Sequence, residues 1–363
     1  MTFHRFTALL ACGVLAFGVA ACGDDDDENG GGDQTSSLSG SIAGAGASSQ
    51  AAAKEAWIAG FQTQNPQATV SYDAVGSGGG REQFIAGGTV FGGSDSPLAG
   101  DELEGAQQRC GGVDNLIQIP IYISPIAIVY NLDGVDELQL SANTLASIMK
   151  RDITNWNDPA IAADNPDADL PDLRITTVNR SDESGTTENF AEYMAAVAPD
   201  IWDFDVSGDW PVRGGEAAQG TSGVVDAVRS GEGTIGYADA SQAGQLGVAQ
   251  IGVGDEFVGP TPDAAGAILD ASERVETEGQ YVFTYELARD TTESGTYPIV
   301  LVAYEMACTQ YDSANDAALL KGFLGYVVSE EGQQAAAEAA GSAPISDEFR
   351  ELVTPAIEAI GGE

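Results

Sequence analysis

Short apolar runs alternate with helical stretches along the chain from about residue 38 onward. Two of these runs, 116–123 and 126–132, are rich in β-branched residues and nearly continuous, which is typical of strands covered on both faces. Ser141 suits the N-cap of a helix that runs through Lys150. We expect further strands at 68–75, 175–178, 234–237 and 299–306. We expect further helices at 51–59, 81–86, 186–198, 224–229, 315–328 and 332–340. Strands separated by helices predict an α/β fold with parallel sheets and helices on their faces.

The charge balance narrows the choice of partners. The 363 residues include 14 Lys and Arg against 56 Asp and Glu, for a formal net charge of −42. Such acidity argues against a nucleic acid or an anionic membrane surface as a partner. The length favours about two domains, and the 43% hydrophobic content is too high for a disordered chain.

The first residues have the pattern of an export signal. An apolar run follows Arg5, and residues 19–22 (VAAC) resemble the lipobox of bacterial lipoproteins. We therefore expect a lipoprotein signal peptide over residues 1–21 and a lipidated Cys22 that anchors the chain on the extracytoplasmic side of the cell membrane. Residues 22–37 are acidic and Gly-rich, which favours a flexible tether. The alternative is an ordinary signal peptide with a chance Cys.

The sequence lacks the residues that several common catalytic and metal sites require. The single His is His4, inside the expected signal peptide, so a mature chain would have no His for a Ser-His or Cys-His nucleophile or for a zinc site. The sequence contains no P-loop motif and no C-x-x-C motif. We therefore expect that the protein is not an enzyme and that it binds no metal and no cofactor. With Cys22 acylated, Cys110 and Cys308 remain as one possible disulfide pair, and two separate buried thiols are the alternative.

Four loops have the pattern of an anion site, in which small residues and hydroxyls precede a helix or follow an apolar run. Free backbone N–H groups and the positive end of the helix dipole attract anions at such places. The loops are 44–50 (GAGASSQ), 76–80 (GSGGG), 92–98 (GGSDSPL) and 179–187 (NRSDESGTT). The last one contains Arg180, whose guanidinium suits a tetrahedral oxyanion, although pairing with Asp182 at the surface is an alternative.

Asp95, in the third of these loops, suits only an anion that carries a proton. A carboxylate can accept that proton from HPO₄²⁻ or H₂PO₄⁻, whereas sulfate has none to donate. A site built around one ligand OH rejects analogues that lack it by about 10⁴–10⁵. A plain turn ahead of Pro97 is the alternative.

The four loops, in this order, resemble those of the phosphate-binding proteins of high-affinity phosphate ABC transporters. The stretches 119–138, 152–162 and 233–239 fit the same family, and the resemblance runs from about residue 40 to 345. It implies a periplasmic-binding-protein type II-like fold with two α/β domains and a ligand cleft between them. Domain I would comprise 38–122 and 295–363, and domain II would comprise 123–294.

The resemblance also implies the function and its residues. The chain would be a monomer that captures inorganic phosphate by hinge closure and delivers it to the membrane permease. The residues that it assigns to phosphate are Ser48, Ser49, Ser77, Asp95, Arg180, Asp182, Ser184, Gly185 and Thr186. Among them, Ser49 would donate through its backbone N–H, Asp95 would accept the phosphate proton, and Asp182 would orient Arg180.

Glu183 and residues 293–296 do not follow the pattern of the other site loops. Glu183 stands where the family commonly has Gly, and we expect its side chain to point to solvent. Residues 293–296 repeat the sequence ESGT but precede a strand, so we expect a turn there that does not touch the ligand. The competing functions are a binding protein for sulfate or molybdate and, less favoured, a phosphatase-like enzyme with Ser184 or Ser77 as nucleophile.

Overall fold

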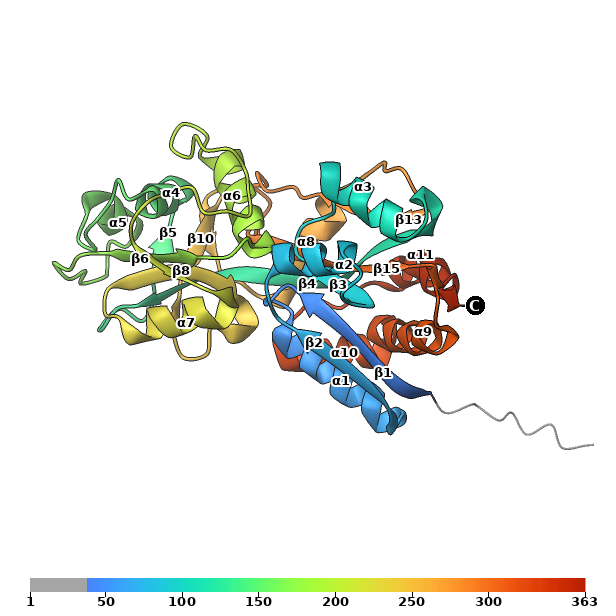
Figure 1. The fold of residues 1–363 in the computed structure, drawn as a ribbon. Coiled ribbons are helices and arrows are strands. Elements are labelled where there is room, and N and C mark those ends of the chain that lie inside the picture. Colours follow the sequence, from blue (N-terminus) through green and yellow to red (C-terminus); the bar gives the residue numbers. More distant parts are fainter. Residues whose placement is uncertain (1–37, 363) are drawn as a thin grey trace, which may run out of the picture. The chain divides into compact units, whose positions relative to one another are not determined.

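A 16-residue strand, β4 (Leu116–Asn131), joins two parts of one ten-stranded sheet in the computed structural model, which describes residues 38–362 (Figure 1). Residues 116–125 of β4 pair with β15 (Val300–Cys308), and residues 126–131 pair with β8 (Thr234–Asp239), both antiparallel. We call the strands on the β15 side the first half of the sheet and those on the β8 side the second half. The expected signal peptide, tether and lipidated Cys22 lie outside the described residues.

The sheet runs in the order β2-β1-β3-β15-β4-β8-β6-β7, with β9 and β13 also paired to β4. The remaining strands of this sheet are β1 (Ser39–Gly46), β2 (Gln67–Asp73), β3 (Phe91–Ser94), β6 (Thr176–Arg180), β7 (Glu216–Ala218), β9 (Gly247–Val248) and β13 (Tyr281–Val282). Strand β1 is parallel to β2 and β3, and β6 is parallel to β7 and β8. These pairs agree with the expected parallel strands, but β15 and β4 enter antiparallel, so that the sheet as a whole is mixed.

Three small sheets complete the strands. They are formed by β5 (Gln139–Leu140), β10 (Gln250–Val253) and β11 (Glu256–Val258); by β12 (Glu273–Val275) and β14 (Thr284–Glu286); and by β16 (Gln310–Tyr311) and β17 (Gly361–Gly362).

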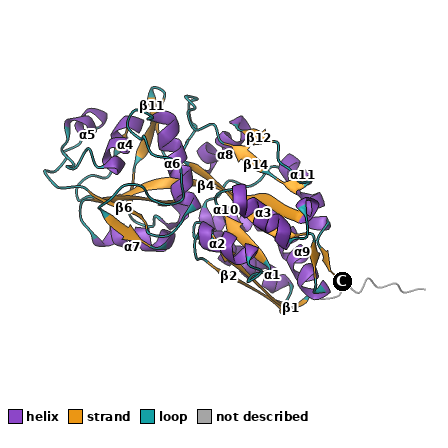
Figure 2. Ribbon diagram, turned by 45° about the horizontal axis from the view of Figure 1, so that its top comes forward, coloured by secondary structure: helices purple, strands orange, loops and turns teal. Residues whose placement is uncertain are grey.

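Helices pack around the strands of both halves (Figure 2). Helices α2 and α9 contact β1, α1 contacts β2, and α7 contacts β6 and β8. The α-helices are α1 (Ala51–Gln64), α2 (Ser77–Ile85), α3 (Gly100–Arg109), α4 (Ala142–Lys150), α5 (Pro159–Asp164), α6 (Gly185–Val197), α7 (Gly220–Ser230), α8 (Pro262–Ala271), α9 (Ala314–Val328), α10 (Glu330–Ala340) and α11 (Asp347–Glu358). Two 3₁₀ turns, η1 (Val113–Asn115) and η2 (Ala240–Gln242), complete the set.

Local sequence explains several boundaries. Ser141 caps α4, as expected, by accepting a hydrogen bond from the Thr144 N–H at 3.4 Å. The two strands expected at 116–123 and 126–132 are one strand, and Pro125, which has no N–H to donate, lies where the partner changes from β15 to β8. Helix α2 begins at Ser77 and not at Arg81, because the Gly-rich stretch forms its first turn.

The core of the first half contains a buried ion pair. Lys54 of α1 pairs with Glu305 of β15, and both side chains are at most 1% exposed. The Lys54 ammonium also lies over the rings of Trp57, Tyr72 and Phe91 at 4.9–5.4 Å. A buried charge is costly unless it is paired, so this pair ties α1 to the sheet without leaving a free cation.

Within the described range, residues 38–362 form one compact unit. The expected domain boundaries near 122 and 294 therefore stay a prediction. Within residues 38–362, we find no helix that is both long and apolar enough to span a membrane.

Candidate anion-binding site

The structure brings together the four loops that the sequence indicates. The β1–α1 loop, the first turn of α2 and the loop after β3 belong to the first half of the sheet, and we call them the first side of the site. The β6–α6 loop belongs to the second half, and we call it the second side. Ser49 on the first side and Thr186 on the second both donate hydrogen bonds to Asp95. The two sides therefore meet around one carboxylate.

Asp95 is 2% exposed, and each of its two carboxylate oxygens accepts one hydrogen bond, which leaves capacity to accept another. Its Oδ1 accepts from the Ser49 hydroxyl at 2.7 Å, and its Oδ2 accepts from the Thr186 hydroxyl at 2.9 Å. Its backbone N–H donates to the Ser77 Oγ at 3.1 Å, and its carbonyl accepts from the Asn189 amide at 2.8 Å. Asp95 is thus a fixed acceptor at the meeting point of the two sides.

Burial raises the pKa of Asp95 above its ordinary value. The hydroxyls of Ser49 and Thr186 and the charges of Arg180 and Arg81 act in the opposite direction, since they stabilise the carboxylate. A carboxylate whose pKa is raised by desolvation gains from sharing a proton. Asp95 therefore suits a ligand with an acidic O–H group.

Arg180, at the end of β6, is the cation of the second side and is 3% exposed. Its Nε donates to Asp182 Oδ1 at 2.8 Å, and its Nη2 contacts Asp182 Oδ2. Partial burial alone would raise the pKa of Asp182, but the hydrogen bonds and the charge of Arg180 outweigh it, so that the pKa is lowered. A Cβ added to Gly76 would lie 3.4 Å from Arg180 Nη2. The guanidinium therefore reaches the start of α2 on the first side.

Helix α6 begins at the site, where Ser184 is its N-cap. The Ser184 Oγ accepts from the Thr187 N–H at 3.2 Å. Gly185 follows, and a Cβ there would lie 2.8 Å from Asp95 Cβ, Ser77 Oγ and Ser96 Oγ. This close approach requires a residue without a side chain at position 185. It brings the positive end of the α6 dipole against the first side.

Helix α7 also contributes to the site, although the sequence did not lead us to expect it there. The Thr221 N–H donates to the Ser48 Oγ at 3.0 Å, and the two hydroxyls are 3.1 Å apart. The Gly220 N–H donates to Asp182 Oδ1 at 3.0 Å. Residues 220–223 (GTSG) open a helix just as the recognised loops do, so this signal was available in the sequence. Gln242 of η2 adds a bond from its amide to the Ser48 carbonyl at 2.9 Å.

The structure also shows the surroundings of Glu183 and of the turn at residues 293–296. Glu183 does not simply face solvent: its carboxylate pairs with Arg81 of α2, although the side chain stays 45% exposed. The expected exposure is therefore confirmed in part, whereas the contact with Arg81 was not indicated by the sequence around Glu183. Residues 293–296 lie in a turn whose Gly295 N–H donates to Glu256 Oε1 at 2.6 Å, and Glu256 is in β11, outside the site loops.

The two cysteines of the possible pair are bonded in this structure. Cys110, after α3, and Cys308, at the end of β15, form a disulfide that joins positions 198 residues apart. Both thiol positions are buried, at 5% and 2% exposed. The bond ties α3 to the first half of the sheet, away from the site residues.

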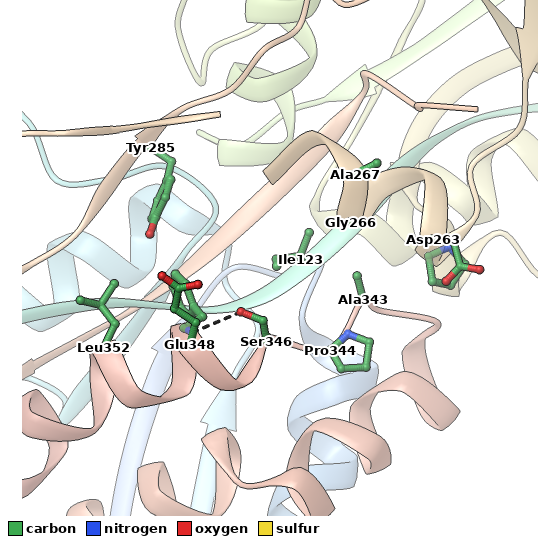
Figure 3. Close-up of a pocket in the computed structure, with 12 residues that line it drawn as sticks. Ile123, Asp263, Gly266, Ala267, Tyr285, Ala343, Pro344, Ser346, Glu348 and Leu352 are labelled. Atoms are coloured by element: carbon green, nitrogen blue, oxygen red, sulfur yellow. Dashed lines mark hydrogen bonds between the residues drawn. The ribbon is translucent and has the colours of Figure 1, made fainter. Parts of the chain in front are cut away.

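The hollows of the molecule differ in the chemistry that lines them. A cavity of about 540 Å³ opens beside Ser48, Gly220 and Gln242, at the edge of the site. A second cavity, of about 520 Å³, lies between α8 and α11 and is drawn in Figure 3. Asp263 and Glu348 are the charged side chains among the described residues that line this second cavity. It is therefore unsuited to an anion, whereas the site around Asp95 and Arg180 combines a cation with helix N-termini.

Among the side chains that the structure describes (residues 38–362 without 269–271), no three of His, Cys, Asp or Glu are grouped so that they could hold a metal ion. The arrangement of the site residues suits direct binding of a tetrahedral oxyanion. The donors would be hydroxyls, backbone N–H groups and a guanidinium, and Asp95 would accept the proton of the anion.

Comparison with known proteins bears on the whole chain. Residues 31–331 match the family model described as the PBP superfamily domain. "Phosphate-binding protein PstS 3" of Mycobacterium tuberculosis is 36% identical over 99% of this chain and 100% of its own length. "Phosphate-binding protein PstS" of Haemophilus influenzae is 32% identical over 82% of this chain and 87% of its own.

Solved structures show the same fold. The phosphate-binding protein of Stenotrophomonas maltophilia superposes with a TM-score of 0.67 at 19% identity, over 87% of this chain and 93% of that one. Because the family model covers most of the chain and the curated relatives exceed 30% identity over nearly their full lengths, the assignment does not depend on any single loop. The chain belongs to the phosphate-binding protein family of the PBP superfamily.

Proposed function

We propose that this chain is an extracytoplasmic solute-binding protein that captures inorganic phosphate and delivers it to the permease of an ABC transporter. The observation that carries the proposal is the buried Asp95 carboxylate, which accepts hydrogen bonds from both sides and is stabilised by the charge of Arg180. The phosphate-binding names of the relatives support the same ligand.

The two sides of the site divide the recognition of phosphate. Arg180, oriented by Asp182, would bind two phosphate oxygens with charge-assisted hydrogen bonds. The hydroxyls of Ser48 and Ser77, together with N–H groups at the starts of α1 and α6, would bind the others. Asp95 would accept the hydrogen bond of the phosphate O–H. Because sulfate has no proton at neutral pH, it would place an oxygen lone pair against this carboxylate and be rejected.

Capture would proceed by closure of the second side over the first. Hydrogen bonds between the sides, such as Thr221 to Ser48 and Thr186 to Asp95, can form only when the two sides are together. Phosphate, which contacts both sides, would therefore stabilise the closed form by its differential affinity. The closed form would present the chain to the permease.

The proposal includes a place in the cell. The sequence 19–22 (VAAC) supports cleavage before Cys22 and lipidation of its side chain, and the acidic residues that follow would separate the binding unit from the membrane. We assign no catalytic step, because the site provides donors and a proton acceptor but no His for a nucleophile–base pair.

Calorimetric titration of the full chain, freed of bound phosphate, tests the proposal. We expect tight one-to-one binding of phosphate and no heat with sulfate or molybdate. The same preparation, incubated with p-nitrophenyl phosphate, should release no p-nitrophenol. Folded, ligand-free protein that ignored phosphate and bound sulfate would contradict the proposal, and steady ester hydrolysis would favour the phosphatase alternative.

A further inference from the structure

Glu183, on the second side of the site, lies directly over the first turn of α2 on the first side. Its carboxylate pairs with Arg81, and its carbonyl accepts a hydrogen bond from the Gly78 N–H at 3.4 Å. Both the side chain and the backbone of this residue therefore reach across the site. Neither contact is to a group that we assign to the anion.

Glycine at position 78 provides the space for the Glu183 side chain. A Cβ on Gly78 would lie 2.6 Å from Glu183 Cδ and 2.8 Å from its Cβ, both too close for real atoms. A Cβ on the adjacent Gly79 would instead meet only Val75 of its own half, at 3.0 Å or more. Of these two neighbouring glycines, one faces Glu183 and the other does not.

Arg81 is already held in place by residues of its own side. Its Nε donates to Glu102 of α3 at 2.8 Å, and its Nη1 donates to Ser94 at 2.9 Å. These two hydrogen bonds come from the first half and do not involve Glu183, so they restrict the rotamer of Arg81 whether or not Glu183 is in contact. Little side-chain entropy is then lost when the third partner binds, which makes the contact more favourable than an ordinary surface pair.

We propose that the Arg81–Glu183 ion pair holds the two sides of the site together, so that Glu183 slows the release of phosphate without touching it. This inference depends on the proposed function, since it assumes that phosphate is the ligand and that the two sides separate to release it. The pair can form only in the closed form, and an interaction present in one state alone shifts the equilibrium toward that state.

Two carboxylates on the same guanidinium provide a matched test. Glu183 and Glu102 are similarly exposed, at 45% and 40%, but Glu183 comes from the second side and Glu102 from the first. Phosphate release should be timed by stopped-flow fluorescence in the full chain, with a second phosphate-binding reagent as trap. We expect Glu183→Gln to speed release roughly three- to tenfold, and Glu102→Gln to change it less than about twofold. The difference between wild type and Glu183→Gln should shrink as salt is raised.

A second pair of variants tests the same contact by filling the space that Gly78 leaves for the Glu183 side chain. Gly78→Ala should push Glu183 away and speed release in the same direction, whereas Gly79→Ala should release phosphate like the wild type. Both changes raise helix propensity, so circular dichroism and thermal melting will show whether the variants fold.

The outcomes separate the two proposals. If the wild-type chain does not bind phosphate, the proposed function fails. If the wild type binds phosphate and Glu183→Gln releases it at the wild-type rate, the proposed function stands and the role of the ion pair is refuted. An equal effect of Glu102→Gln would also refute it, because the effect would then follow the charge near Arg81 and not the contact between the sides.

Discussion

The two sides of the site contribute different chemistry. The first side offers the hydroxyls of Ser48 and Ser77, the backbone N–H of Ser49 and the buried carboxylate of Asp95. The second side offers the guanidinium of Arg180 and the start of α6. In our proposal the second side therefore supplies most of the attraction for negative charge, and the first side selects the protonated anion. Affinity and selectivity should then be separable by mutation.

The cations of the first side are already paired with protein groups, so they do not change this division between attraction and selection. Lys54 is paired with Glu305 inside the core, and Arg81 is occupied by Glu102, Ser94 and Glu183. Arg180 is thus the cation that we assign to the anion, whereas the charge of Arg81 is matched by Glu102 and Glu183. A chain with a net charge of −42 thus concentrates its anion attraction in one well-oriented side chain.

The largest effect should come from Arg180→Ala. The substitution removes charge-assisted hydrogen bonds and leaves the Asp182 carboxylate facing the site without its partner, so phosphate affinity should fall by roughly 10²–10⁴-fold. Titration calorimetry measures this loss. Arg229→Ala is the control, because Arg229 is in the same half but 53% exposed and paired with Asp226. Affinity near that of the wild type in Arg180→Ala would contradict the assignment of the second side.

A buried carboxylate of the second half should show its effect in stability. Asp239, at the end of β8, accepts from the Tyr122 hydroxyl at 3.2 Å and from the Ser241 N–H at 3.0 Å. Burial raises the pKa of Asp239 to about 7, the hydrogen bonds from Ser241 oppose the rise, and the charge of Asp95 adds to it. The folded chain therefore retains a proton at pH values where the unfolded chain, with an ordinary Asp pKa of about 4, has lost it.

The sign of the pH dependence follows from this difference. The stability that protonated Asp239 contributes is complete below about pH 4 and is lost as the pH rises through about 7. Without phosphate, urea denaturation should show that Asp239→Asn gains roughly 2–3 kcal/mol relative to the wild type between pH 5 and pH 8. If Asp239→Asn changed the free energy of unfolding by the same amount at pH 5 and at pH 8, Asp239 would already be charged in the folded chain at pH 5.

Asp95→Asn should separate selectivity from affinity. The amide cannot accept the phosphate proton as a carboxylate does, so phosphate affinity should fall by roughly 10- to 100-fold, while sulfate should begin to bind. Titrations with both anions test this, with the exposed Asp73→Asn as control. If the variant lost phosphate and still excluded sulfate, the first side would not be the selective one.

Much of the site could be predicted from sequence because its signals are local. The loops 44–50, 76–80 and 179–187 each place small residues or hydroxyls ahead of a helix, and such residues cap and open helices in any context. The structure then brings these loops together around Asp95. The start of α7 at Thr221 has the same pattern of small residues and hydroxyls ahead of a helix. We predicted the helix there but did not predict that its first residues would lie at the site.

What the sequence did not reveal depends on partners far along the chain. Glu183 meets Arg81 102 residues away, and Lys54 meets Glu305 251 residues away. No local pattern indicates either pair. The continuity of β4 was missed for a related reason, since Pro125 normally interrupts a strand and is accommodated here only because the strand changes partners at that residue.

The smallest effect should come from the contact between Ser48 and α7. Thr221→Val keeps the β-branched shape but removes the hydroxyl that lies 3.1 Å from Ser48 Oγ. The Thr221 N–H still donates to Ser48, so only one neutral hydrogen bond is lost, and phosphate affinity should fall about two- to fivefold. The neighbouring Ser222→Ala is the control, because Ser222 is exposed. A loss as large as that of Asp95→Asn would mean that α7 belongs to the binding machinery itself, and that the second side selects the ligand as well as attracting it.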